Sequence, residues 1–280
     1  MLLAFLLLKS ITNLSIMKKQ LWLFGVLALL LTACSSDEKS SSEEIDSTLP
    51  KNISYIYPSP ELGTNSKTTA SYNGNKIVSL LKDDSKTVFT YDGDVIVKQE
   101  EFDIENGKEI KNEEVSYSYE NGKLKTRVFR ERISAEYPDG YFIEKVVYTH
   151  NSNGTVSYIN YTVDNVKKTE SKDGEGTLTY KDGNLIKEEQ KSGSSTATLV
   201  FEYDSKKNPL KNILGFNLLL NEIDGFGTNN IVKTTRTTTE FPNPSVYLTT
   251  YIYNEASYPT RHTSFDGGGK NIEYEIEYAY

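Results

Sequence analysis

The amino-acid sequence predicts an all-β protein, an antiparallel meander of roughly 14 to 16 strands. Stretches rich in Tyr, Thr, Val and Ile alternate polar and apolar residues from about Lys67 to the end of the chain. Most of these stretches end in Asn-Gly or Asp-Gly. Alternation with a period of two is typical of strands with one wet face, and Asn-Gly and Asp-Gly favour two-residue hairpin turns.

The expected turns define where one strand gives way to the next. They are Asn73-Gly74, Asp92-Gly93, Asn106-Gly107, Asn121-Gly122, Asp139-Gly140, Asn153-Gly154, Asp173-Gly174 and Asp182-Gly183, with Asp224-Gly225 and Asp266-Gly267 as further members. Their spacing is irregular. The pattern therefore indicates an irregular meander rather than a solenoid of strict repeats.

Three segments illustrate the alternation between the turns. Residues 273–280 carry Tyr or Ile at every even position, and residues 197–203 carry apolar residues at the odd ones. Residues 111–120 place Val115, Tyr117 and Tyr119 on one face. Each segment fits a strand that buries one face.

One segment breaks this pattern. Residues 208–220 are the most apolar stretch after the N-terminus, and Leu210, Ile213, Leu214 and Leu218 lie at helical spacing after Pro209. Proline suits the first position of a helix. We expect one short helix or loop near 209–221 that caps the sheet or plugs a barrel mouth, either as a hydrophobic lid over the core or as a ligand gate.

The N-terminal region is expected to be a signal peptide covering residues 1–33. It contains Lys9, Lys18 and Lys19, no acidic residue, and an apolar stretch over 21–33. That stretch is shorter than the about 20 residues that a membrane-spanning helix needs. Since a basic segment directly follows Met17, we expect translation to start there rather than at Met1.

The signal peptide ends in Leu31-Thr32-Ala33-Cys34, which resembles the lipobox of bacterial lipoproteins. The resemblance implies that a diacylglycerol is attached to the Cys34 thiol and that the chain is cut before it. Residues 35–38, Ser-Ser-Asp-Glu, resemble the surface-export signal of Bacteroidetes lipoproteins. We therefore expect residues 34–50 to be a lipidated, disordered Ser/acid-rich tether, residues 51–280 a single all-β domain, and the location the outer membrane, at the cell surface.

Composition excludes several classes of site and partner. One Cys and two His exclude an internal disulfide and the usual zinc sets. A net charge of -8 argues against nucleic acid as a partner. We expect no metal site and no cofactor.

No catalytic constellation stands out. His150 and His262 are expected at the surface, and the chain has no G-x-S-x-G motif. The acid pairs Glu100/Glu101, Glu113/Glu114 and Glu188/Glu189 are adjacent, so strands point their members to opposite faces. Residues 92–94 and 173–176 lack a complete calcium loop and are better explained as turns. The protein is accordingly expected not to be an enzyme.

Several longer segments carry a family resemblance. Residues 117–124, 201–210, 229–232, 251–254 and 258–260 resemble a family of uncharacterised Bacteroidetes outer-membrane lipoproteins with a porin-like fold, and single pieces are similar to YD repeats. The resemblance implies a many-stranded barrel or strongly curved sheet and carries no activity. Lys123, Lys125, Arg127, Arg130 and Arg132 charge both faces of one strand, which indicates a barrel that does not span the membrane.

Two functions follow as expectations. The first is a non-enzymatic binding or structural module, joined to the membrane through Cys34, with a glycan, a peptide or another envelope protein as possible ligand. The alternative is a glycan-active hydrolase with carboxylates in a barrel mouth, which needs two acids about 5–9.5 Å apart. The 20 Tyr either pack across strands or form an exposed binding platform.

Overall fold

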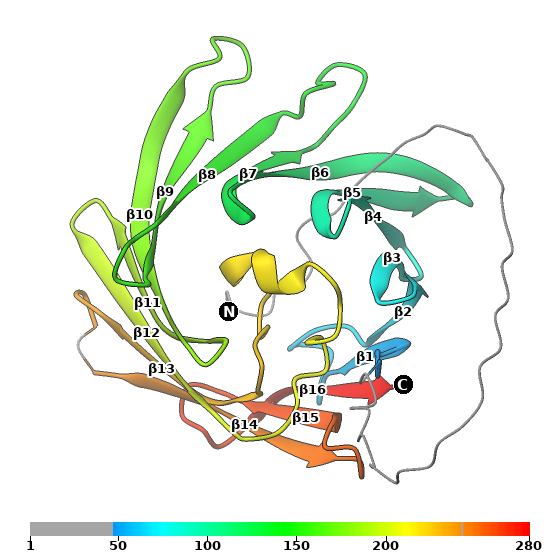
Figure 1. Ribbon diagram of the computed structural model, residues 1–280. Coiled ribbons are helices and arrows are strands. Elements are labelled where there is room, and N and C mark those ends of the chain that lie inside the picture. Colours follow the sequence, from blue (N-terminus) through cyan, green and yellow to red (C-terminus); the bar gives the residue numbers. More distant parts are fainter. Residues whose placement is uncertain (1–46, 242) are drawn as a thin grey trace, which may run out of the picture.

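A computed structural model describes residues 47–241 and 243–280 and shows a closed antiparallel barrel of 16 strands (Figure 1). The strands are β1 Asn52–Ile56, β2 Ser66–Asn73, β3 Lys76–Leu81, β4 Ser85–Asp92, β5 Val95–Glu105, β6 Lys108–Glu120, β7 Lys123–Glu131, β8 Phe142–His150, β9 Val156–Val163, β10 Glu170–Lys181, β11 Asn184–Ser192, β12 Ser195–Tyr203, β13 Ile231–Thr238, β14 Ser245–Tyr253, β15 Pro259–Phe265 and β16 Ile272–Ala279. The predicted all-β meander is confirmed.

Each strand pairs with its neighbours in sequence, and the first strand closes the barrel on the last. Asn52 of β1 lies opposite Ala279 of β16, and Tyr55 lies opposite Ile276. Closure gives every strand two hydrogen-bonded neighbours, so the described sheet has no free edge.

The tight hairpins use two turn geometries. Asn106-Gly107, Asn121-Gly122 and Asp182-Gly183 have positive φ at both residues, as a type I′ turn requires. Before β3 and β5 the glycine comes first, since Gly74 and Gly93 have φ of 61° and 55° and the next residue is not positive. A positive φ at the first of the two turn residues alone is typical of a type II′ turn.

Some of the expected hairpin turns are not two-residue hairpins. Asp139-Gly140 and Asn153-Gly154 lie in longer connections, and Asp173-Gly174 lies inside β10. A Cβ on Gly174 would come within 2.9 Å of the Lys191 carbonyl oxygen of β11. Glycine is therefore needed there for the close approach of two strands and not for a turn.

The two ends of the barrel differ. The end that we name the plug end holds the turns 74–75, 93–94, 121–122 and 182–183, the start of β1 and the end of β16. The far end holds the longer connections 57–65, 132–141, 164–169 and 266–271.

Residues 204–230, named here the luminal segment, connect β12 to β13 and lie within the ring of strands (Figure 1). The segment contains two 3-10 helices, η2 Phe216–Leu218 and η3 Leu220–Glu222, where we expected one short helix or loop. Gly215 and Leu220 have φ of 86° and 56°, and each left-handed residue interrupts a continuing helix. The expectation that this stretch plugs the barrel is correct.

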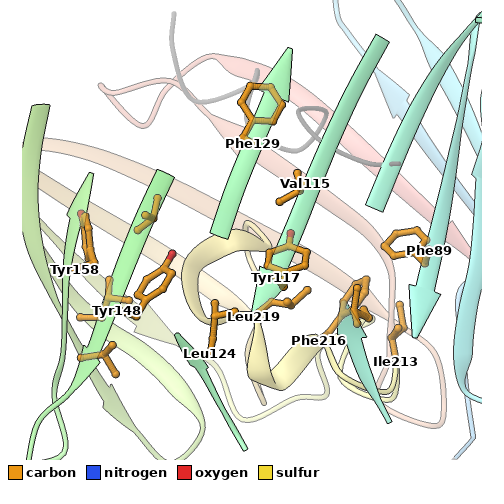
Figure 2. Close-up of a cluster of buried hydrophobic side chains, with 14 of the residues drawn as sticks. Phe89, Val115, Tyr117, Leu124, Phe129, Tyr148, Tyr158, Ile213, Phe216 and Leu219 are labelled. Atoms are coloured by element: carbon orange, nitrogen blue, oxygen red, sulfur yellow. The ribbon is translucent and has the colours of Figure 1, made fainter. Parts of the chain in front are cut away.

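The luminal segment completes the hydrophobic core (Figure 2). Ile213, Phe216 and Leu219 are at most 5% exposed and pack against inward side chains of the wall. These wall residues are Ile77, Phe89, Ile96, Val115, Tyr117, Leu124, Phe129, Val146, Tyr148, Val156, Tyr158 and Leu178. They come from β3 to β10, so the core fills one side of the lumen.

Strand alternation and register sort the other side chains into an inner and an outer set. Ion pairs with N–O distances of 2.5 to 3.2 Å lie on the outer wall from β4 round to β16. They join Lys86 to Glu109, Lys111 to Glu100, Arg130 to Glu114, Lys145 to Glu170, Lys187 to Glu189, Lys233 to Glu202, and Arg261 to Glu277. Among the described residues no helix is long and apolar enough to cross a membrane.

The body of the protein begins slightly earlier than the expected boundary at residue 51. Leu49 packs against the core, and Pro50 is buried. The Thr48 carbonyl accepts a hydrogen bond of 3.0 Å from Asn212, and the Pro50 carbonyl accepts one of 2.8 Å from Tyr72. Residues 48–50 therefore belong to the barrel and not to the tether. The expected signal peptide, Cys34 and the tether up to residue 46 lie outside the described residues.

Candidate functional site

The candidate site is a cavity of about 140 Å³ inside the barrel. It lies between the luminal segment and the inner faces of β1 to β6. Tyr55, Phe89 and Ile213 contribute apolar or aromatic lining, while Glu101 and Asp224 contribute carboxylates. A largely apolar cavity with a few charged groups is the usual form of a small-ligand site.

The adjacent acid pairs point to opposite faces, as the sequence predicts. Glu100 faces outward, where Lys111 Nζ lies 2.5 Å from its Oε1, and Glu101 faces the cavity. The sequence did not predict that inward-facing acids of two neighbouring strands lie opposite each other. Glu101 of β5 is the register partner of Glu113 of β6. Burial and then the Glu113 charge raise the pKa of Glu101 to about 8.

Arg127 of β7 ties the luminal segment to the wall. Its Nε lies 2.7 Å from Glu222 Oε2, and its Nη1 lies 2.5 Å from Glu144 Oε1 of β8. The Tyr148 hydroxyl also donates a hydrogen bond to Glu222. Burial raises the pKa of Glu222, and Arg127 opposes this shift. Glu222 is therefore held in an ion pair that fixes η3 in the lumen.

A second link joins the luminal segment to β9 and β11. The Tyr158 hydroxyl donates a hydrogen bond of 2.7 Å to Glu188 Oε1, which also accepts one of 3.2 Å from Asn221. The Tyr158 ring lies over Gly176 of β10, where any Cβ would collide with it. The absence of a side chain at Gly176 thus makes room for the tyrosine that holds Glu188.

An aromatic row lines the opposite inner wall, formed by β1 and β14–β16. Ring centroids lie 6.1 Å apart for Tyr57 and Tyr274, 5.7 Å for Tyr274 and His262, and 5.2 Å for His262 and Tyr251. Tyr55 lies 5.9 Å from Tyr274. Tyr55, Tyr251 and Tyr274 lie on the inner wall, and Tyr57 continues the row into the 57–65 connection. They do not form the exposed outer platform that the sequence left open.

His262 belongs to this inner row, which corrects the expectation of a surface histidine. Register places it opposite Tyr251 and Ile276, and its Nε2 lies 2.6 Å from Ser264 Oγ. Burial lowers its pKa to about 4. The other histidine, His150, ends β8 with its Nε2 2.9 Å from the Leu124 carbonyl. In the described part of the chain, neither histidine forms a hydrogen bond with an acidic residue.

Asp224 of the luminal segment lines the cavity and is itself an exposed side chain. Burial, and to a smaller extent the charge of Asp224, raises the pKa of Tyr55 of β1, Tyr203 of β12 and Tyr274 and Tyr278 of β16. Burial raises the pKa of Asp224 itself, and its carboxylate accepts a hydrogen bond from the Gly225 backbone. No lysine or arginine of the described residues lies within 4.0 Å of it. The sequence pattern suggested only a turn at this position.

The remaining acids of the turns have ordinary surface roles. Asp94 lies 3.2 Å from Lys76, and Glu175 lies 2.7 Å from Lys172. Within residues 47–241 and 243–280 no group of three His, Cys, Asp or Glu side chains could hold a metal ion. Cys34, the predicted lipid site, is outside this range.

No protein-family model and no curated protein matches the chain significantly. Solved structures match it at low identity. A porin-like protein from Bacteroides vulgatus has a TM-score of 0.55 at 14% identity, over 83% of this chain and 98% of its own. A porin-like protein from Bacteroides uniformis has a TM-score of 0.34 at 10% identity, over 82% and 97% of the two chains. A protein of unknown function from Bacteroides fragilis has a TM-score of 0.22 at 10% identity, over 56% and 84%. The first match establishes that this chain is similar in fold to a porin-like protein from Bacteroides vulgatus.

Proposed function

We propose that the protein is a lipid-anchored envelope protein that binds a small ligand inside its barrel and catalyses no reaction. The observation that carries this proposal is the distribution of charge. Paired charges cover the outer wall, while an aromatic cavity with the carboxylate of Asp224 lies inside. A ligand-binding interior and a water-facing exterior are the arrangement of a soluble binding barrel.

The outer wall supports attachment by lipid rather than insertion of the barrel. A single lysine or arginine facing lipid near the midplane costs about 2–4 kcal/mol. Ion pairs on the outer wall recur from β4 to β16, so no lipid-facing belt free of charge runs round this part of the barrel. The lipobox-like Leu31–Cys34 supplies another means of attachment, and the similarity to a porin-like Bacteroides protein fits an envelope location.

The position of the chain start orients the barrel. Residues 48–50 enter at the plug end, where the luminal segment also lies. A tether from Cys34 therefore leaves the far end turned away from the membrane. On the cell surface this end would face the medium, which gives a ligand access to the lumen without passing the anchor.

The hydrolase alternative rests on one observation. Glu101, whose pKa is raised to about 8, lines the same cavity as Asp224, so two carboxyl groups from different elements share one site. Binding is favoured over hydrolysis because a cavity of about 140 Å³ leaves little room for two sugar units and a water. Hydrolysis of a glycan panel by the wild type, abolished in Glu101→Gln, would reverse this preference.

Two measurements test the proposal. Cells fed radiolabelled palmitate should label the wild-type chain and not Cys34→Ser, and external protease should digest the labelled protein on intact cells. A screen of small molecules against the purified full chain should find ligands that raise its melting temperature. An unlabelled wild-type protein refutes the anchor, and a screen without any stabilising ligand refutes the binding role.

A further inference from the structure

We propose that the aromatic row of the inner wall binds a neutral pyranose sugar, whose apolar C–H face stacks on the rings of Tyr251, His262 and Tyr274. This inference rests on the proposed function, because it names the chemical class of the ligand for the same lumen. It combines the placement of the row, the solvent access of its rings, their fixed spacing and the chemistry of the wall between them.

The row is a straight line of side chains across four strands. Tyr55 of β1 lines the cavity, so its strand face is the inner one. Register places Ile276 opposite Tyr55, His262 opposite Ile276 and Tyr251 opposite His262. Residues that lie directly opposite each other in a sheet share a face. The row and the cavity therefore adjoin at Tyr55.

The rings of the row keep solvent access inside the lumen. In the described chain, none of the side chains of the hydrophobic core, buried or partly buried, comes from β1 or β12–β16. The aromatic rings buried in that core are at most 8% exposed. Tyr55, Tyr251, His262 and Tyr274 are instead half-buried. Since these side chains face inward, their exposed surface faces the part of the lumen that the luminal segment leaves open.

The rings are held in place before any ligand arrives. Neighbouring centroids lie 5.2 to 6.1 Å apart, and Tyr253 continues the row with its ring stacked 5.8 Å from that of Tyr251. The Tyr251 hydroxyl donates a hydrogen bond of 2.9 Å to the Ile231 carbonyl. At the far end, the Tyr57 ring lies so close to Gly63 that a Cβ there would come within 2.6 Å of it. Fixed rings leave little ordering cost for a ligand.

The wall beside the row is uncharged. The charged residues of β14–β16 are Arg261, Glu273, Glu275 and Glu277. They alternate with members of the row and therefore lie on the outer face, where Arg261 pairs with Glu277 at 2.5 Å. His262 is neutral at pH 7, because burial lowers its pKa to about 4. Such a wall favours an uncharged ligand, since burying a charge without a partner is costly.

Hydroxyl groups lie between the rings. Ser264 is the register partner of Thr249 and of Tyr274, so these side chains share the face of the row. The Ser264 Oγ lies 2.6 Å from His262 Nε2. Rings and hydroxyls together suit a ligand with an apolar face and a polar rim. A pyranose ring has both, with C–H groups on its face and hydroxyl groups round its edge, whereas an apolar aromatic ligand has no such rim.

Saturation-transfer NMR on the purified full chain gives a direct test. The probes are the methyl pyranosides of glucose, galactose and mannose, and sorbitol is the control because it has the hydroxyl groups without a ring face. Irradiation of the tyrosine resonances should transfer saturation to the ring C–H protons of at least one pyranoside and not to sorbitol. The corresponding uronic acid glycoside should bind at least about tenfold more weakly in isothermal titration.

Tyr274 is the residue to substitute, because its ring contacts those of Tyr55, Tyr57 and His262. Tyr274→Leu should weaken binding of that pyranoside at least about fivefold, and Tyr274→Phe, which keeps the ring, should stay within about twofold of the wild type. Tyr141→Leu removes a tyrosine that is 55% exposed in the 132–141 connection and should leave binding unchanged.

Each outcome decides the inference. It is overturned if no pyranoside binds, if sorbitol or the uronic acid binds equally well, or if Tyr274→Leu binds like the wild type. The NMR comparison uses the wild type, so it decides even where Tyr274→Leu folds poorly. If no pyranoside binds while the melting-temperature screen finds another ligand, the lumen remains a binding site and only the sugar class is wrong.

Discussion

Acidification should weaken the barrel through His262. The imidazole lies between the rings of Tyr251 and Tyr274 on the inner wall, and burial lowers its pKa from 6.5 to about 4. In the unfolded chain the same group takes up a proton near its ordinary pKa. The unfolded state therefore binds more protons between these two values, and the free energy of unfolding falls as the pH falls through that window.

The magnitude follows from the two pKa values. Linkage gives a loss of about 1 kcal/mol at pH 6 and about 2 kcal/mol at pH 5, relative to pH 8. Carboxyl groups whose pKa values burial raises, such as Glu101 and Glu222, act in the opposite direction. A matched variant is therefore needed to isolate the histidine.

His262→Gln removes the titrating group and keeps a polar side chain of similar reach. Urea unfolding of both proteins, followed by circular dichroism between pH 8 and pH 5, gives the difference in their unfolding free energies at each pH. We expect the stability of the wild type to fall relative to the variant by about 2 kcal/mol over this range. A difference that stays constant with pH would refute the assignment of His262 as a buried neutral imidazole.

Three further substitutions test the lumen. Gly176→Ala should lower the free energy of unfolding by about 1–3 kcal/mol, because its Cβ would meet the Tyr158 ring and come within 2.5 Å of the Glu189 carbonyl oxygen. An unchanged melting temperature would contradict this. Arg127→Met should cost about 3–5 kcal/mol in urea unfolding, since it leaves the Glu222 carboxylate buried without its nearest cation. Adding Glu222→Gln should recover part of this loss, and purely additive losses would count against the ion pair. Glu101→Gln should gain on the order of 3 kcal/mol over the wild type as the pH rises from 5 to 8, because folded Glu101 keeps a proton that the unfolded chain releases. The same measurement contradicts the raised pKa if the gain does not depend on pH.

The strand pattern was predictable because turn chemistry and alternation are local. Asn121-Gly122 and Asp182-Gly183 adopt the type I′ geometry that their residue types favour. Asp173-Gly174 carries the same signal and lies within a strand, because the approach of β11 also requires glycine. A dipeptide cannot distinguish these two reasons for a glycine.

The site was harder to predict because it depends on which face of each strand turns inward. The pair Glu188/Glu189 and the pair Glu100/Glu101 look alike in sequence, and both faces of several strands carry charge. Only closure of the barrel brings Glu188 to Asn221 of the luminal segment, a contact across 33 residues. Asp224 was interpreted as a turn residue, since nothing near it in sequence indicates that it lines a cavity with Tyr55 of β1.

The pairing of β1 with β16 has a consequence for how the chain folds. Hairpins along the meander can form as soon as both of their strands have been synthesised. The pairing of β1 with β16, named here the seam, joins residues as distant as Asn52 and Ala279. Such non-local pairing is slow, because the chain loses the conformational entropy of a long loop before the stabilising contacts between the two strands form. Until then both terminal strands expose unpaired backbone groups that other chains can add to. A chain that stops before Ile272 would never form the seam, and we expect it to self-associate edge to edge.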